Sequence, residues 1–189
     1  ITKPFNADFD GDEMNIHVPQ SLEAQVELKY LSFSHWNLIS PQHSKPNMAI
    51  VQDSLLGAYQ MTNGPVKLSK DKFFNIIMKL NTPPWIKSSS DIMPTDYMLE
   101  RMNQIRIVLK SVGYKAQCYN GHGLISMFLP PDFNYTKKNE QRDDQPAVCV
   151  RKGVMYAGVV DKSVIGSSHN SIHQLLYKEY NAETAVYFI

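Results

Sequence analysis

Apolar side chains recur at helical spacing in several stretches of the chain, and most of these stretches begin beside a residue that can cap a helix. Ser21 precedes a run that continues to Leu31, with Glu23 in the first turn, where the helix dipole favours an acid. We expect most of this helix to be buried. Helices are predicted over residues 21–31, 49–62, 69–80, 95–112 and 182–189, and another is predicted to begin at 166–168.

Alternation of apolar and polar residues, the pattern of a half-buried strand, follows an acidic stretch near the start of the chain. Ile16 and Val18 flank the polar His17. Residues 1–20 are therefore predicted as a strand, a loop and a second strand.

Two valine-rich runs, 148–150 and 154–160, are separated by turn residues that include Lys152 and Gly153. This arrangement predicts a β-hairpin. The polar stretch 132–146 is predicted as a mobile surface loop. Together with the helices, these strands predict the α+β class.

Turn-forming residues divide the chain after the second predicted helix, at Asn63, Gly64 and Pro65. We predict one region over 1–65, which holds the acidic loop, and a smaller domain of helices and strands over 66–189. No internal repeat is visible.

Composition narrows the class of protein without identifying it. The 189 residues are 43% hydrophobic, enough for a real core, and the net charge of +1 gives no electrostatic signal for nucleic acid. Cys118 and Cys149 are too few and too far apart for a zinc module, so no zinc is expected. No apolar run approaches membrane-spanning length, and we expect no membrane partner.

The acidic loop carries the strongest chemical signal. Asp8, Asp10 and Asp12 stand at alternate positions, and Gly11 allows the turn that would bring the third carboxylate close. Three like charges so close repel one another, and a divalent cation would remove the conflict. Oxygen-only ligands indicate a hard ion such as Mg²⁺.

Two other interpretations of this loop were weighed. An EF-hand loop counted from Asp8 requires glycine at its sixth position and glutamate at its twelfth, where this chain has Glu13 and Pro19. A solvated acidic turn is the usual interpretation of an isolated D-x-D. The extent of the pattern argues against it here.

The seven residues from Asn6 to Asp12 read NADFDGD, which resembles the catalytic loop of the largest subunit of multisubunit DNA-dependent RNA polymerases. This motif is highly specific. The resemblance continues through residues 13–20, 40–42, 45–46, 52–53, 158–160 and 165–168. It is weak at 119–123, where Tyr119, His122 and Gly123 replace the family's tryptophan, lysine and glutamine.

The resemblance implies a two-metal mechanism of RNA synthesis. Asp8, Asp10 and Asp12 would bind a tightly held Mg²⁺, and a second Mg²⁺ would arrive with the nucleoside triphosphate. Asn6 would lie near the ribose of that nucleotide, and the segment Lys45–Pro46 would line the catalytic cavity. Region 1–65 would be the active-site region, and 66–189 a pore-like domain that runs into the next, funnel-like region.

The resemblance also implies partners: the second-largest and smaller polymerase subunits, the DNA template, the RNA product and nucleoside triphosphates. Because the chain opens with Ile1 and the loop follows almost at once, we expect an excised piece of a multidomain subunit, inactive alone. We expect a large cytoplasmic DNA virus as the source, and so the virion and host cytoplasm, with a nuclear enzyme as the alternative.

Two other functions stay open at the level of the sequence. The chain could act mainly as an assembly or docking module that binds other subunits or a cleavage factor. An unrelated Mg²⁺-dependent phosphotransferase would call for a glycine-rich nucleotide loop or a Walker lysine, and neither motif is present.

Overall fold

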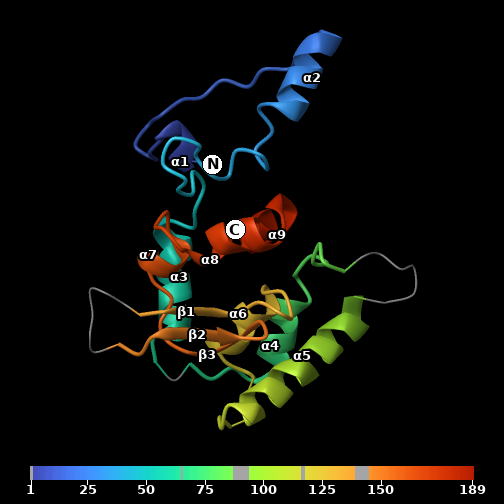
Figure 1. Ribbon diagram of the computed structural model, residues 1–189, viewed down its shortest axis with the longest axis vertical. Coiled ribbons are helices and arrows are strands. Elements are labelled where there is room, and N and C mark those ends of the chain that lie inside the picture. Colours follow the sequence, from blue (N-terminus) through green and yellow to red (C-terminus); the bar gives the residue numbers. More distant parts are fainter. Residues whose placement is uncertain (1, 65, 87–93, 116–117, 139–144) are drawn as a thin grey trace.

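The computed structural model describes residues 2–64, 66–86, 94–115, 118–138 and 145–189. It confirms the α+β class, since helices surround a small antiparallel sheet (Figure 1). The elements are α1 (Thr2–Phe5), α2 (Leu22–Tyr30), α3 (Gln52–Thr62), α4 (Lys70–Ile77), α5 (Pro94–Ser111), α6 (Gly121–Met127), β1 (Tyr135–Lys137), β2 (Val148–Arg151), β3 (Val154–Ala157), α7 (Lys162–Ile165), α8 (Ile172–Glu179) and α9 (Ala182–Phe188).

The sheet is antiparallel with the order β1-β2-β3. The predicted hairpin is confirmed, because Lys152 and Gly153 adopt φ of 49° and 68° between β2 and β3, as a tight hairpin turn requires. Strand β1 was not predicted. It lies in the polar stretch 132–146, where Tyr135 is buried and pairs with Val150.

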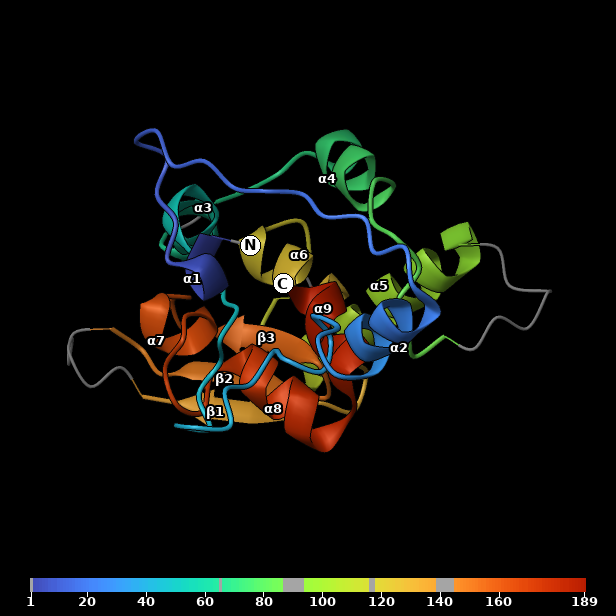
Figure 2. The ribbon, with the colours of Figure 1, turned by 90° about the horizontal axis from the view of Figure 1, so that it is seen from above.

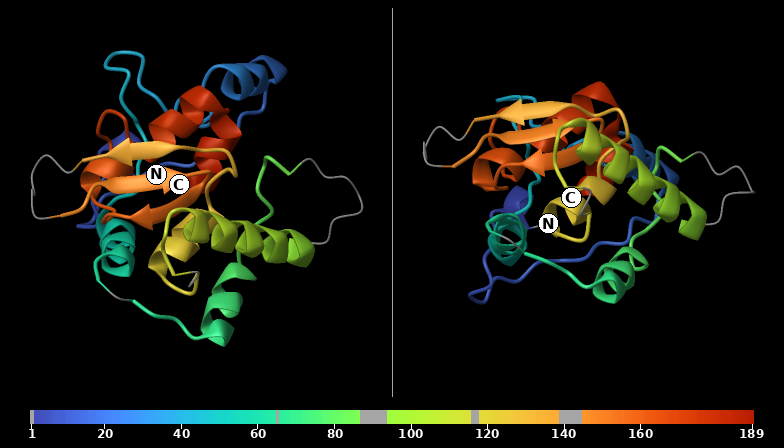
Figure 3. Two further views of the ribbon diagram at one scale, coloured as in Figure 1. Left: turned by 60° about the horizontal axis from the view of Figure 1, so that its bottom comes forward. Right: turned by 90° about the horizontal axis from the view of Figure 1, so that it is seen from below.

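Two apolar clusters lie on opposite faces of the sheet, and Figure 3 shows the helices that cover each face. The first cluster joins β1 and β2 to α7, α8 and α9 and includes Phe133, Ile172 and Leu176. The second joins α4, α5 and α6 and includes Phe73 and Ile105. All five of these side chains are fully buried.

Two short helices begin where their serines predicted. The Ser21 and Ser69 hydroxyls accept hydrogen bonds from Ala24 N and Lys72 N, at 3.2 and 3.3 Å, and so cap α2 and α4. The long helix α5 is also confirmed. Its predicted core stripe is buried and comprises Met98, Met102, Ile105 and Leu109.

Other helix boundaries differ from the prediction. Helix α3 begins at Gln52, three residues after the expected start at Ala49. Gly166 does not begin a helix; it ends α7, and its N–H donates to the carbonyl of Lys162 at 2.9 Å. Helix α8 then begins after Ser171.

Helix α6 was not predicted, because its two glycines are poor helix formers. Close packing requires them. A Cβ on Gly121 would stand 2.0 Å from the carbonyl oxygen of Met61, and one on Gly123 would stand 1.9 Å from that of Cys118. Gly121 therefore lets α6 pack closely against α3, and Gly123 lets it pack against the segment that precedes it.

A buried cation joins α5 to the hairpin. The Arg101 side chain is only 1% exposed, and its Nη2 donates to the carbonyls of Ser126, Leu129 and Gly153 at 3.0, 3.1 and 2.8 Å. Burial lowers the pKa of this guanidinium from its ordinary value. Three carbonyl oxygens take the place of a carboxylate partner.

The predicted strand, loop and strand over residues 1–20 is wrong. Helix α1 comes first, and the chain from Asp12 to Gln20 is extended but pairs with no strand in the described residues. Ile16 and Val18 are 95% and 80% exposed. Alternation gives a strand only when a neighbouring strand is present, and here none is.

The expected burial of α2 is also wrong. No residue of this helix is buried, and Leu22 is 73% exposed. Figure 1 shows α2 extending away from the sheet. The helix forms because its cap is local, but the described chain supplies nothing to cover it.

Candidate functional site

The aspartate loop (residues 6–12) leaves the end of α1 through a tight turn. Asn6 N and Ala7 N donate to the carbonyls of Lys3 and Thr2 at 3.1 and 3.0 Å. Asn6 has φ of 48°, in the left-handed region that asparagine tolerates. Its side chain is exposed at the start of the loop.

The tip of the loop turns at Gly11, which has φ of +118°, a value that an L-residue rarely adopts. As a result Asp12 folds back, and its Oδ2 accepts a hydrogen bond from Asp8 N at 3.0 Å. The turn at Gly11 predicted from the sequence is therefore present. Asp8, Asp10 and Asp12 are all exposed to solvent.

The three carboxylates are not gathered into one cluster. Among the described residues, no group of three or more histidine, cysteine, aspartate or glutamate side chains is arranged to hold a metal ion. The donor chemistry itself fits a hard cation, since every candidate ligand is a carboxylate oxygen. The loop thus offers suitable ligands and still needs a scaffold that confines them.

The segment that contains Lys45 forms a second ordered turn. Ser40 N donates to the carbonyl of Lys45 at 2.8 Å, and Ile39 bridges Pro46. Pro46 is buried and Lys45 is exposed. Asp53 lies in the first turn of α3, in the dipole-favoured position that the sequence predicted.

The residues that depart from the weak family motif at 119–123 have structural contacts. His122 Nε2 lies 2.8 Å from the carbonyl oxygen of Gly158, and the Tyr119 hydroxyl accepts from Arg106 Nη2 at 2.8 Å. The two cysteines, Cys118 and Cys149, are free thiols.

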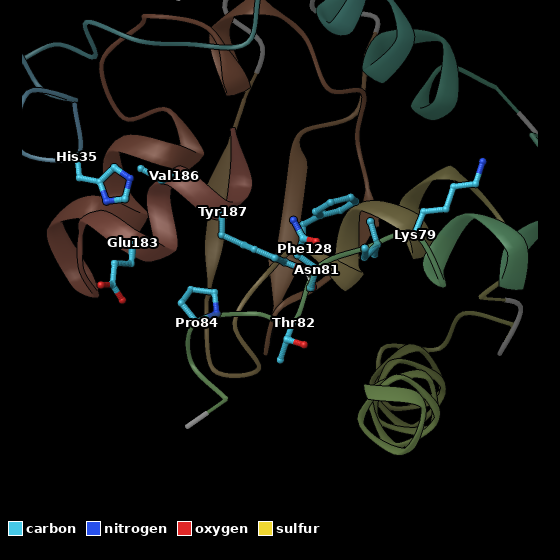
Figure 4. A pocket seen from close by; sticks show the side chains of 10 residues that line it. His35, Lys79, Asn81, Thr82, Pro84, Phe128, Glu183, Val186 and Tyr187 are labelled. Carbon is cyan, nitrogen blue, oxygen red and sulfur yellow. Dashed lines mark hydrogen bonds between the residues drawn. The ribbon is translucent and has the colours of Figure 1, made fainter. Parts of the chain in front are cut away.

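A groove of about 530 Å³ lies between α9, the C-terminal end of α6 and the segment after α4 (Figure 4). The Tyr187 side chain lines the groove, and its hydroxyl donates to the carbonyl of Asn81 at 3.0 Å. Phe128 also lines the groove. His35 and Glu183 also line the groove, whereas no residue of the aspartate loop does. This groove could not be predicted from the sequence, because its walls come from segments that are far apart along the chain.

Across the parts of the chain that the structure describes, we find no helix both long and apolar enough to cross a membrane.

Two family models match this chain. The family model "RNA polymerase Rpb1, domain 3" matches residues 37–189, and "RNA polymerase Rpb1, domain 2" matches residues 1–33. The two matches meet between the exposed N-terminal segment and the packed remainder.

Several relatives align with nearly the whole chain. A probable DNA-directed RNA polymerase II subunit RPB1 homolog of Invertebrate iridescent virus 6 is 39% identical over 100% of this chain and 17% of its own length. The subunit RPB1-B of Trypanosoma brucei brucei is 31% identical over 100% of this chain and 10% of its own. Subunit Rpo1N of Sulfolobus acidocaldarius is 30% identical over 95% and 19%.

The chain therefore spans less than a fifth of the length of these relatives. It matches two domains of one family, and its NADFDGD loop lies within the residues matched by domain 2. This chain belongs to the family of the largest subunit of DNA-directed RNA polymerases, Rpb1.

Proposed function

We propose that this chain is the part of a polymerase catalytic subunit that supplies the metal-binding aspartates. The reaction is template-directed transfer of ribonucleotides from nucleoside triphosphates to the RNA 3′ end. The observation that carries the proposal is the solvent-exposed NADFDGD loop, turned at Gly11, in a chain of the Rpb1 family.

Asp8, Asp10 and Asp12 would hold one Mg²⁺, and Asp8 and Asp10 would also contact a second that arrives with the nucleotide. When bound, the two ions lower the pKa of the attacking 3′-hydroxyl and neutralise charge on the leaving pyrophosphate. The Asn6 amide can donate and accept, which suits the hydroxyls of a ribose. Its exposed position at the start of the aspartate loop supports this role.

The rest of the site comes from outside the chain. The other polymerase subunits, the DNA template and the RNA product complete it, which fits a net charge of only +1 on this chain. We expect the chain alone to incorporate no nucleotide, because its carboxylates are exposed and ungathered.

An assembly role is the second candidate function. The N-terminal segment (residues 2–36) exposes large apolar side chains, among them Phe9 at 82% and Leu31 at 71%. Surfaces of this kind mark protein contacts. Catalysis remains the first proposal, because a contact surface alone does not require three alternating aspartates.

The division into an active-site region, 1–65, and a pore-like domain, 66–189, stays a prediction. Leu38, Ile50 and Leu55 pack with the cluster that includes α8, so contacts cross that division. We propose a large cytoplasmic DNA virus as the source, with the virion and host cytoplasm as location and the nucleus as alternative. The similarity to the iridescent virus relative supports a viral source.

The test is Asp10→Asn in the complete polymerase, with RNA primer extension measured at saturating Mg²⁺. This change keeps the size of the side chain and removes the charge that a metal needs. We expect a loss of about three orders of magnitude or more with normal assembly and template binding.

Glu13→Gln is the matched control, since Glu13 is an exposed acid one residue beyond the loop. It should stay within a few-fold of wild type. Asp10→Asn activity at the level of this control would contradict the proposed mechanism.

A further inference from the structure

The first turn of α8 carries polar side chains in an otherwise apolar core. Ser171, His173 and Gln174 are at most 2% exposed, beside the fully buried Ile172 and Leu176. Burying a polar group costs free energy unless it makes a hydrogen bond. Their contacts are therefore worth tracing.

Gln174 holds two turns at once. Its Oε1 accepts from Asn170 N at 2.7 Å, and its Nε2 donates to the carbonyl oxygen of Ser44 at 2.5 Å. Ser44 has φ of 51°, an uncommon value for a serine, so this backbone conformation needs support from its surroundings. Ser44 immediately precedes Lys45, in the segment expected at the catalytic cavity.

Lys3 connects the loop between α7 and α8 to the start of the aspartate loop. Its Nζ donates to the hydroxyl of Ser167, which is 164 residues away in sequence. The carbonyl of the same lysine accepts from Asn6 N at 3.1 Å. Figure 2 shows α1 close to α7, just before the segment that contains Ser167.

His173 lies near this contact and stays uncharged. Burial, together with the positive charge of Lys3, lowers the imidazole pKa to about 4. Within the described residues, neither its ring nitrogens nor the Ser171 hydroxyl has a hydrogen-bond partner.

We propose that the first turn of α8, together with Ser167, positions two segments for catalysis: the aspartate loop through Lys3, and the turn before Lys45 through Gln174. The catalytic part of this inference rests on the proposed function. Both contacts join the first 45 residues to residues 167–174. The C-terminal part of the chain therefore contacts both segments.

Hydrogen exchange in the assembled polymerase tests each contact separately. Lys3→Met removes the donor to Ser167, and we expect the hydrogen-bonded amides of the 6–12 loop, those of Asn6, Ala7 and Asp8, to exchange about fivefold faster. Gln174→Met keeps the side-chain size and should speed exchange in residues 40–46 by about tenfold. Lys3→Arg keeps a donor and should restore the wild-type rate in 6–12.

Ser168→Ala is the matched control. Ser168 is the neighbour of Ser167, and its hydroxyl contacts the Lys162 carbonyl at 3.4 Å. It should leave both segments unchanged. Unchanged exchange in 6–12 for Lys3→Met, or equal effects on both segments from either variant, would overturn the proposal.

Catalysis provides a separate measurement. In Lys3→Met, the Mg²⁺ concentration for half-maximal primer extension should rise about fivefold, with the rate at saturating Mg²⁺ within about twofold. The exchange result does not depend on turnover. If Asp10→Asn proved active, the proposed function would fail while the exchange data would still decide whether these contacts hold the loop.

Discussion

Two helices of this chain have the same local design and opposite surroundings. Helix α2 has nine residues after Ser21, and α4 has eight after Ser69, and each serine hydroxyl caps its helix. In α4, Phe73 and Ile77 are fully buried, whereas no residue of α2 is buried.

The difference shows that helix formation depends on local residues, whereas burial of the helix depends on a packing surface. The cap and the first-turn acid act within a few residues, so both helices form. Burial requires another surface, which the second apolar cluster provides for α4. For α2 the described residues provide no such surface, and the chain spans less than a fifth of the length of its relatives.

The largest expected effect is in the packed region. Phe73→Ala should lower the free energy of unfolding by about 4 kcal/mol, because it removes a fully buried ring between α4 and α5. Urea denaturation of the chain measures this. A loss below 1 kcal/mol would mean that α4 is no better packed than α2.

A smaller effect on stability is expected at His173, in helix α8. Its lowered pKa means that the folded chain binds fewer protons than the unfolded chain between pH 6.5 and about 4. The free energy of unfolding should therefore fall by about 2 kcal/mol from pH 7 to pH 5. His173→Gln should reduce this acid sensitivity, and the exposed His169→Gln should keep it, as urea denaturation at each pH can show.

The smallest effect is expected in α2. Val26 is 47% exposed, so Val26→Ala should change the free energy of unfolding of the chain by less than about 0.5 kcal/mol. If another part of the enzyme covers α2, the same change in the assembled polymerase should lower the free energy of unfolding by more, about 1–2 kcal/mol. Equal values in both settings would leave α2 exposed in the enzyme.

Local signals predicted much of the fold correctly. Ser21, Ser69 and the methionine stripe of α5 indicated three helices, and the turn at Lys152 and Gly153 indicated the hairpin. Each signal acts within one or two turns of chain. The class and the turn at Gly11 followed from the same kind of information.

Features that depend on distant residues could not be predicted in this way. Strand β1 lies in a polar stretch and is defined by its pairing with β2. Helix α6 is set by close contact with α3, which its glycines permit. The strand predicted through Ile16 is wrong for the converse reason, since its pattern is present but the described residues contain no strand that pairs with it.

The candidate site divides along the same line. The three aspartates can be recognised from seven consecutive residues, because all of the proposed metal ligands lie in one short loop. The contacts of Lys3 and Gln174 join residues more than a hundred positions apart, and nothing in the sequence pairs them.

The most direct test of the central claim asks where the metal binds in the assembled polymerase. Fe²⁺ can replace Mg²⁺ at oxygen sites and, with a reductant and peroxide, cleaves the polypeptide close to where it is bound. We expect cleavage at residues 6–12 in the wild-type enzyme and its loss in Asp10→Asn. Cleavage that persists in Asp10→Asn, or that maps only to other parts of the subunit, would contradict it.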